Sequence, residues 1–235
     1  MDPMARGGAR RYLDTTPPEE HRPQFGEVNL NQLSLTGLAD LYGSDKGTIK
    51  HNYAVVYERI VHQLLNGKNR LSSKINIGEV GVACGASLRM WGNYLPNAKI
   101  FGFDVRADCS KLCSDLENVS IIIEDATKLK NKNQYESFFD LFVDDGSHIS
   151  EDIVATFESC WAWIKPSGYY IIEDLSCTYK DEYTQAFIKT FGREVKNKRE
   201  TFLLLVDALM KHCDTKKGSI KSMEYHPQLL IIKKN

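Results

Sequence analysis

Acidic side chains and one histidine gather in two short stretches of the sequence where a metal ion could bind. The first stretch is Val143-Asp144-Asp145-Gly146-Ser147-His148, and the second is Ile171-Ile172-Glu173-Asp174-Leu175. Carboxylates are the oxygen ligands that Mg²⁺ and Ca²⁺ prefer, and three of them brought together would repel one another without a cation. Asp145, Glu173 and Asp174 are therefore predicted to hold Mg²⁺ or another divalent cation.

His148 is the candidate general base of this predicted metal site. The unperturbed pKa of a histidine side chain lies near neutrality, which suits the removal of a proton from a substrate hydroxyl group. Asp144 or Asp145 is the alternative base. In a purely structural interpretation, Asp145 instead caps a helix that starts near Ile149, and His148 only packs.

A second set of candidate residues belongs to a glycine loop, Glu79-Val80-Gly81-Val82-Ala83-Cys84-Gly85-Ala86-Ser87. Glycines four residues apart let the backbone approach a ligand closely and then enter a helix N-terminus. The loop lacks the GxGxxG spacing and has no basic residue, so it suits a nucleoside ligand without a pyrophosphate; the alternative is an ordinary tight turn. Asp104 is predicted to accept the ribose hydroxyls, and Asp125 the adenine amino group.

A parallel sheet is the element that would bring these residues together, because ligands bind outside the carboxyl ends of parallel strands. Short apolar runs predict buried strands at 75–80, 100–103, 121–123, 139–143 and 169–172. Helical periodicity precedes them at 33–42 and 53–65 and returns at 201–212, and two final strands at 220–225 and 229–232 are expected to form an antiparallel hairpin. The predicted fold is α/β and Rossmann-like, with a mostly parallel central sheet, this hairpin, and helices on both faces.

Composition limits the classes of protein to which the chain can belong. Of its 235 residues, 42% are hydrophobic and 26% are charged, with a net charge of −1, so a globular domain without a nucleic-acid or membrane partner is expected. Six scattered cysteines predict reduced thiols and a cytoplasmic protein. We expect a flexible leader or expression remnant over residues 1–27 and one domain over 28–235, with a helical cap at 28–70 and the Rossmann-like core at 71–235.

Several motifs together resemble a known family. They are Leu38 to Gly47 (LADLYGSDKG), His51-Asn52-Tyr53 with Tyr57, the loop GEVGVACGAS, DDGSH, and IIEDL followed by Thr178-Tyr179. The glycine loop alone indicates a class I methyltransferase, whereas DDGSH with IIEDL is more specific. The chain from about Leu33 to its last strand resembles the Mg²⁺-dependent sugar O-methyltransferases of macrolide biosynthesis, the mycinamicin and tylosin type.

The resemblance implies methyl transfer from S-adenosylmethionine to a hydroxyl group of a sugar or glycan. It implies Asp145, Glu173 and Asp174 as metal ligands and His148 as the base. The residues that it and the loop assign to the cofactor are Lys46, His51, Tyr53, Glu79, Gly81, Gly85, Ser87, Asp104, Asp125 and Asp144. Tyr179 is expected to line the acceptor site, and homo-oligomerisation is left open.

Two other functions remain compatible with the sequence. The first keeps the fold but replaces the sugar with a catechol-like or other small-molecule diol. The second is a nucleotide-binding or dinucleotide-binding module without methyl transfer. Use of the acidic residues and histidine on iron is less compatible, because the strand ends do not supply two histidines beside a carboxylate.

Overall fold

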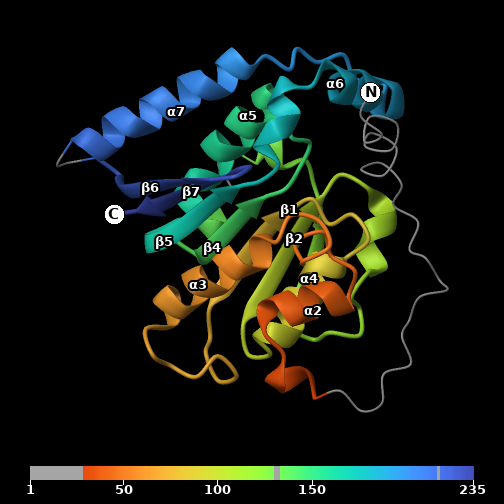
Figure 1. Ribbon diagram of the computed structural model, residues 1–235, viewed down its shortest axis with the longest axis vertical. Coiled ribbons are helices and arrows are strands. Elements are labelled where there is room, and N and C mark those ends of the chain that lie inside the picture. The colour runs from red at the N-terminus through yellow and green to blue at the C-terminus, as the bar shows by residue number, and fades with distance from the viewer. Residues whose placement is uncertain (1–28, 130–132, 216–217) are drawn as a thin grey trace. The chain divides into compact units, whose positions relative to one another are not determined.

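A computed structural model describes residues 29–129, 133–215 and 218–235, so the predicted leader at 1–27 lies outside the described residues. The described strands form one seven-stranded sheet in the order β3-β2-β1-β4-β5-β7-β6 (Figure 1). The strands are β1 (Asn76–Val80), β2 (Lys99–Asp104), β3 (Val119–Ile123), β4 (Phe139–Asp144), β5 (Ile164–Ile172), β6 (Ile220–His226) and β7 (Leu229–Lys234).

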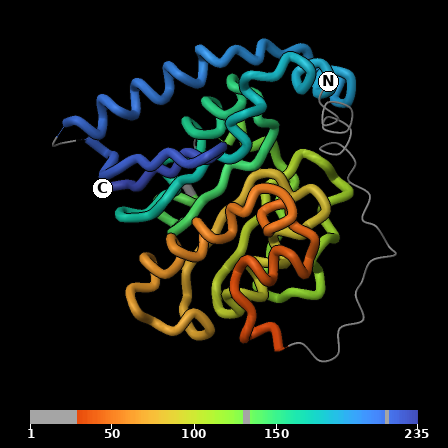
Figure 2. The backbone as a smooth tube through the Cα atoms, viewed as in Figure 1, coloured from red at the N-terminus to blue at the C-terminus, as the bar shows by residue number. Residues whose placement is uncertain are grey.

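The pairing of the strands confirms the predicted fold class. Strand β2 pairs in parallel with both β1 and β3, whereas β7 pairs antiparallel with β5 and β6. The predicted C-terminal hairpin therefore forms, and Figure 2 traces its path at the end of the chain. Helices lie between and before the strands: α2 (Leu35–Leu41), α3 (Tyr53–Leu65), α4 (Ala86–Tyr94), α5 (Ser150–Cys160), α6 (Asp181–Phe191) and α7 (Arg199–Asp214).

The described chain divides into two compact units, and the division runs through β4. The N-terminal unit comprises residues 29–125 and 138–142, and the C-terminal unit comprises 126–129, 133–137, 143–215 and 218–235. The single domain expected over 28–235, with its boundary at residue 70, stays a prediction.

In the N-terminal unit, α2 packs against α3 and α4 (Figure 1). Helix α2 begins at Ser34, whose hydroxyl oxygen accepts a hydrogen bond from the backbone N–H of Gly37 at 3.0 Å. The apolar positions of α3 recur at helical spacing and bury Tyr57, Ile60 and Val61 completely. The predicted helical segments therefore form the cover of this unit.

A cluster of phenylalanine rings explains why the first half of β4 belongs to the N-terminal unit. The Phe139 ring contacts the Phe101, Phe103 and Phe142 rings, with centroids 5.2 to 6.3 Å apart and largely edge-on. Strand β1 approaches this cluster through Gly78, where a Cβ atom would lie only 2.4 Å from the Phe142 ring. A glycine in the middle of β1 is thus required by ring packing.

In the C-terminal unit, α7 packs against α5 and β6 (Figure 1). Helix α6 ends at Gly192, which adopts a left-handed conformation (φ 63°) that favours glycine. Strand β5 starts at Ile164, five residues before the predicted start. The sequence pattern missed this start because the exposed Pro166 and Ser167 interrupt the apolar run. No helix among the described residues combines the length and the apolar character that a membrane crossing requires.

Candidate active site

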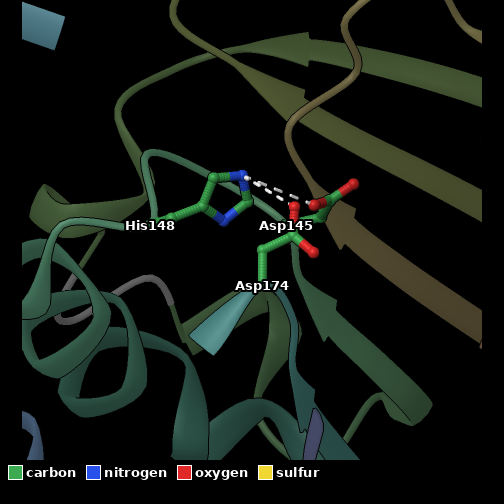
Figure 3. Close-up of side chains that lie close together, drawn as sticks. All are labelled: Asp145, His148 and Asp174. Atoms are coloured by element: carbon green, nitrogen blue, oxygen red, sulfur yellow. Dashed lines mark ion pairs between the residues drawn. The ribbon is translucent and has the colours of Figure 1, made fainter. Parts of the chain in front are cut away.

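The side chains of Asp145, His148 and Asp174 converge in the C-terminal unit (Figure 3). The Nε2 atom of His148 lies 3.8 Å from Oδ1 of Asp145 and 3.9 Å from Oδ2 of Asp174. One potential ligand atom from each residue lies within 4.8 Å of the other two. Opposite oxygen ligands of one Mg²⁺ or Ca²⁺ ion are about 4 to 5 Å apart, so the carboxylates of Asp145 and Asp174 fit a single divalent ion, with the His148 ring beside them.

Two members of this cluster sit on left-handed backbone. The φ angles are 54° at His148 and 53° at Asp174. A residue other than glycine in this region costs on the order of 1 kcal/mol, and such strain concentrates at functional sites. Two of the three converging residues therefore carry backbone strain.

The loop that carries His148 is fixed by residues that the sequence did not single out. The Ser147 hydroxyl donates a hydrogen bond to Asp152 at 2.5 Å, and Arg193 donates two hydrogen bonds to the same carboxylate. The Tyr183 hydroxyl donates to the backbone carbonyl of Ser147 at 2.8 Å. Tyr183 and Arg193 come from α6 and the segment after it, and no spacing in the sequence relates them to the DDGSH motif.

The alternative in which Asp145 caps the following helix is wrong. Helix α5 begins at Ser150 with Ile149 as its N-cap, and the Ile149 side chain makes no capping hydrogen bond. The backbone N–H and hydroxyl of Ser150 instead donate to the side-chain oxygen of Asn197, at 2.9 and 3.0 Å. Asp145 is therefore not needed to start the helix.

Glu173 and Asp144 directly precede Asp174 and Asp145 in the chain, but neither belongs to the cluster of Asp145, His148 and Asp174. Both are buried, with 2% and 4% of their surfaces exposed, and the Glu173 backbone N–H donates to the Asp144 carbonyl at 3.0 Å. The Asp144 carboxylate accepts a hydrogen bond from the Tyr170 hydroxyl at 3.3 Å, and burial raises its pKa to about 7. Glu173 is not among the three residues that converge, so its role as a ligand stays a prediction, as does the role of Asp144 as a base or cofactor contact.

In the N-terminal unit, Asp104 holds the glycine loop in place. The loop adopts left-handed backbone at Gly81, Ala83 and Gly85. Oδ2 of Asp104 accepts hydrogen bonds from the backbone N–H groups of Val82 and Ala83, at 2.9 and 3.3 Å, and Oδ1 accepts one more from the backbone. Asp104 therefore shapes the glycine loop, and its contact with a ribose stays a prediction.

Glu79 organises a buried polar network behind the glycine loop. Its Oε2 atom accepts hydrogen bonds from the Ser87 hydroxyl at 2.8 Å and from the Trp91 indole N–H at 2.9 Å. Its Oε1 atom has no hydrogen-bond partner in the part of the chain that the structure describes. Burial raises the pKa of Glu79, whereas the charge of the buried Lys46 and the two hydrogen bonds lower it. The predicted cofactor residues Lys46, Glu79 and Ser87 thus interact, and Trp91 is a member that the sequence did not indicate.

His51 and Tyr53 also connect to this network. Their rings stack with centroids 4.9 Å apart, and Tyr53 contacts the Tyr57 ring at 6.4 Å. Tyr57 in turn stacks on Trp91 at 5.6 Å. Asp125 follows β3 and is partly buried, and its contact with adenine stays a prediction.

Replacing Gly85 with alanine should destabilise the protein by about 2 to 4 kcal/mol. The left-handed φ of 80° alone costs about 1 to 2 kcal/mol for alanine, and the Cβ atom would lie 3.0 Å from the Cys113 sulfur, which adds a packing penalty. Gly43→Ala is the matched control, because Gly43 has a φ of 69° but nothing within 4 Å of the added atom. Urea unfolding of both variants measures the difference; equal losses would contradict crowding at the loop.

Several known proteins are similar to this chain in sequence. No protein-family model matches the chain. An 8-demethyl-8-α-L-rhamnosyl tetracenomycin-C 2'-O-methyltransferase from Streptomyces olivaceus is 28% identical over 241 residues, and the match covers 96% of this chain and 61% of that protein. An L-olivosyl-oleandolide 3-O-methyltransferase from Streptomyces antibioticus is 30% identical over 152 residues, covering 63% of this chain and 39% of that protein. The chain thus spans less than two thirds of the length of these relatives.

The solved structure of another methyltransferase shares the fold of this chain. It is the MycE methyltransferase of mycinamycin biosynthesis in complex with Mg, SAH and mycinamycin VI, with a TM-score of 0.67 and 21% sequence identity. The likeness covers 86% of this chain and 54% of MycE. The chain therefore has the Rossmann-like fold of the class I methyltransferases. The similar proteins are O-methyltransferases named for sugar-bearing antibiotics, which confirms the resemblance drawn from the glycine loop and the two acidic stretches.

Proposed function

We propose that the chain carries out a metal-dependent transfer of a methyl group from S-adenosylmethionine to a hydroxyl group of a sugar. The observation that carries this proposal is the convergence of Asp145, His148 and Asp174, two of them on strained backbone. Sugar O-methyltransferases among the relatives support the acceptor class, and the Mg and SAH bound to MycE support the choice of metal and cofactor.

The N-terminal unit is proposed to bind the cofactor. S-adenosylmethionine supplies an electrophilic methyl group on a sulfonium. Gly81 and Gly85 let the backbone approach it, and Asp104, which already holds the loop, accepts from the ribose hydroxyls. The fully buried Glu79, with one oxygen lacking a described partner, and the buried Lys46 offer opposite charges to a zwitterionic ligand.

The C-terminal unit is proposed to activate the acceptor. Asp145 and Asp174 would hold the metal ion, with Glu173 as the further predicted ligand, and a bound divalent ion would lower the pKa of a coordinated hydroxyl group. His148 accepts the hydroxyl proton at Nε2, because an imidazole is a better base than a ligand for Mg²⁺. The carboxylates of Asp145 and Asp174, each within 4 Å of that nitrogen, stabilise the imidazolium that forms.

The proposal also covers the acceptor, the cellular compartment and the oligomeric state. The acceptor is a sugar, free or part of a larger molecule, and not a nucleic acid. A reducing compartment such as the cytoplasm agrees with the six cysteines, which are all free thiols. Homo-oligomerisation is left open.

Transfer of a labelled methyl group to glycosides tests the proposed function. The purified chain is incubated with methyl-labelled S-adenosylmethionine and two acceptor sets, rhamnosides and catechols. We expect transfer to a rhamnoside that falls by at least about 10²-fold in EDTA and returns when Mg²⁺ is added in excess.

The two acceptor sets separate the alternatives. Transfer to catechols alone would replace the sugar with a phenolic diol. Undiminished transfer in EDTA would remove the metal from the reaction. Titration with S-adenosylhomocysteine and with NAD is the third comparison, and binding of NAD alone would identify a dinucleotide-binding module.

A further inference from the structure

Arg199 holds two exposed tyrosine rings at the start of α7. Its guanidinium carbon lies 4.2 Å from the centroid of the Tyr179 ring, and its Nη2 donates a hydrogen bond to the Tyr225 hydroxyl at 3.2 Å. Tyr179 ends the short helix η7 (Leu175–Tyr179), and Tyr225 belongs to β6. One guanidinium therefore joins two aromatic side chains that are 46 residues apart in the sequence.

The guanidinium itself is fixed from several sides. Nη1 donates to the Thr178 hydroxyl at 2.7 Å and to the Leu175 carbonyl at 3.4 Å. The ring of Phe202, which is fully buried, lies 4.5 Å from the guanidinium carbon. Such planar, multiply bonded positions are ones that arginine fills and lysine does not. The tyrosines are thus held in place before any ligand arrives.

Both rings remain largely in solvent despite this anchoring. Tyr179 is 67% exposed and Tyr225 is 58% exposed. Ordering an exposed aromatic side chain without burying it costs conformational entropy, and the burial of apolar surface that would offset this cost is absent. A rigid, exposed aromatic pair is typical of a surface that another molecule covers.

The chemistry of the pair favours a sugar ring as the occupant. Tyrosine presents an apolar face with a hydroxyl at its edge, which complements a sugar ring with C–H groups on one face and hydroxyls at its rim. The exposed Lys180, Lys198 and Glu200 adjoin Tyr179 and Arg199 in the chain and offer hydrogen-bonding groups to the hydroxyls of a sugar. Helix η7 directly follows Asp174, so the same short segment carries a member of the acidic cluster and Tyr179.

We propose that Tyr179 and Tyr225, positioned by Arg199, form a saccharide subsite that binds a second sugar ring of the acceptor. This inference rests on the proposed function for its acceptor class. The reacting sugar is assigned to Asp145, His148 and Asp174, and the subsite adds affinity for acceptors with more than one ring.

Binding and kinetics with one-ring and two-ring probes test the subsite. The probes are methyl α-L-rhamnoside and a rhamnose disaccharide, titrated into the full chain with S-adenosylhomocysteine and Mg²⁺ present. Tyr179→Ala and Tyr225→Ala should each weaken disaccharide binding about fivefold to tenfold and leave the monosaccharide unchanged. In the transfer assay, KM for the disaccharide should rise by the same factor while kcat stays constant.

Three further variants separate a binding role from a structural one. Tyr179→Phe keeps the ring and loses only the hydroxyl at its edge, so it should retain most of the disaccharide affinity that Tyr179→Ala loses. Arg199→Lys keeps the charge but loses the planar contacts, and should weaken disaccharide binding about as much as removal of a ring. Phe191→Ala removes a comparably exposed aromatic ring from α6 and should change neither probe.

The outcomes distinguish this inference from the proposed function. Equal disaccharide affinity in Tyr179→Ala, Tyr225→Ala and wild type overturns the subsite, even when methyl transfer to rhamnoside proceeds. Tyrosine-dependent disaccharide binding without any methyl transfer overturns the proposed function and supports the subsite. Binding of p-nitrophenol at the tyrosines with no binding of either glycoside overturns the sugar as occupant.

Discussion

Replacing Asp174 with asparagine should reduce methyl transfer by about 10² to 10⁴-fold and leave the binding of S-adenosylhomocysteine unchanged. The substitution removes one of the two carboxylates within 4 Å of His148 Nε2, and with it a proposed ligand for the metal and a proposed partner for the imidazolium. Asparagine tolerates left-handed backbone at least as well as aspartate, so the φ of 53° is retained. The loss should therefore appear in activity and metal affinity, and not in stability.

Asp181→Asn is the matched control for this experiment. Asp181 is an exposed carboxylate in the first turn of α6, and the same chemical change there should leave transfer unaffected. Titration with Mn²⁺ and with S-adenosylhomocysteine completes the measurement, and metal affinity should fall at least about tenfold in Asp174→Asn alone. Wild-type turnover in Asp174→Asn would show that the acidic cluster does not take part in the reaction.

Replacing Lys46 with methionine should destabilise the protein by about 3 to 5 kcal/mol at neutral pH. Lys46 is only 1% exposed, and its charge is the largest influence that lowers the pKa of the fully buried Glu79. Removal of Lys46 leaves the Glu79 charge buried without this compensation, which is more costly than removal of both, and it also ends the 3.9 Å ion pair of Lys46 with the partly exposed Asp45. The double variant Lys46→Met with Glu79→Gln should therefore recover most of the lost stability in urea unfolding.

The pH dependence of the same variants provides a second readout. The folded-state pKa of Glu79 is raised by burial, so its contribution to stability is fully present below the unfolded-state pKa, about 4.5, and is lost as pH rises through the folded-state value. Without Lys46 the folded-state pKa should rise further. The deficit of Lys46→Met should thus shrink at acidic pH and grow above it, whereas the double variant should show no such change. A deficit independent of pH would exclude Glu79 as its cause.

Most of the fold was predictable because its signals are local. Buried parallel strands consist of continuous apolar runs, and β1 to β4 start and end within two residues of their predicted bounds. The antiparallel hairpin followed from two apolar runs around Pro227, which cannot donate to a central ladder. Strand β5 was predicted too short, because the exposed Pro166 and Ser167 separate its buried first residue from the apolar run that follows.

The candidate site was less predictable, because its geometry depends on backbone dihedral angles and on distant contacts. The sequence indicated that the acids follow neighbouring strands, but not that the left-handed backbone at His148 would bring its ring against Asp145 and Asp174. Asp104 and Ser87 were predicted as ligand contacts, which stays a prediction; the structure shows that Asp104 holds the glycine loop and that Ser87 donates to Glu79. Arg199 and Tyr225 lie far from Tyr179 in the chain, and no local motif relates them.

The left-handed backbone at His148 and Asp174 places activity and stability in opposition at these two positions. Glycine adopts this conformation without strain, so selection for thermal stability alone would favour glycine at residues 148 and 174. Such a selected protein would melt at a higher temperature and would lack the proposed base and a proposed metal ligand. These two positions therefore mark where a stability-guided redesign of the chain must leave the sequence unchanged.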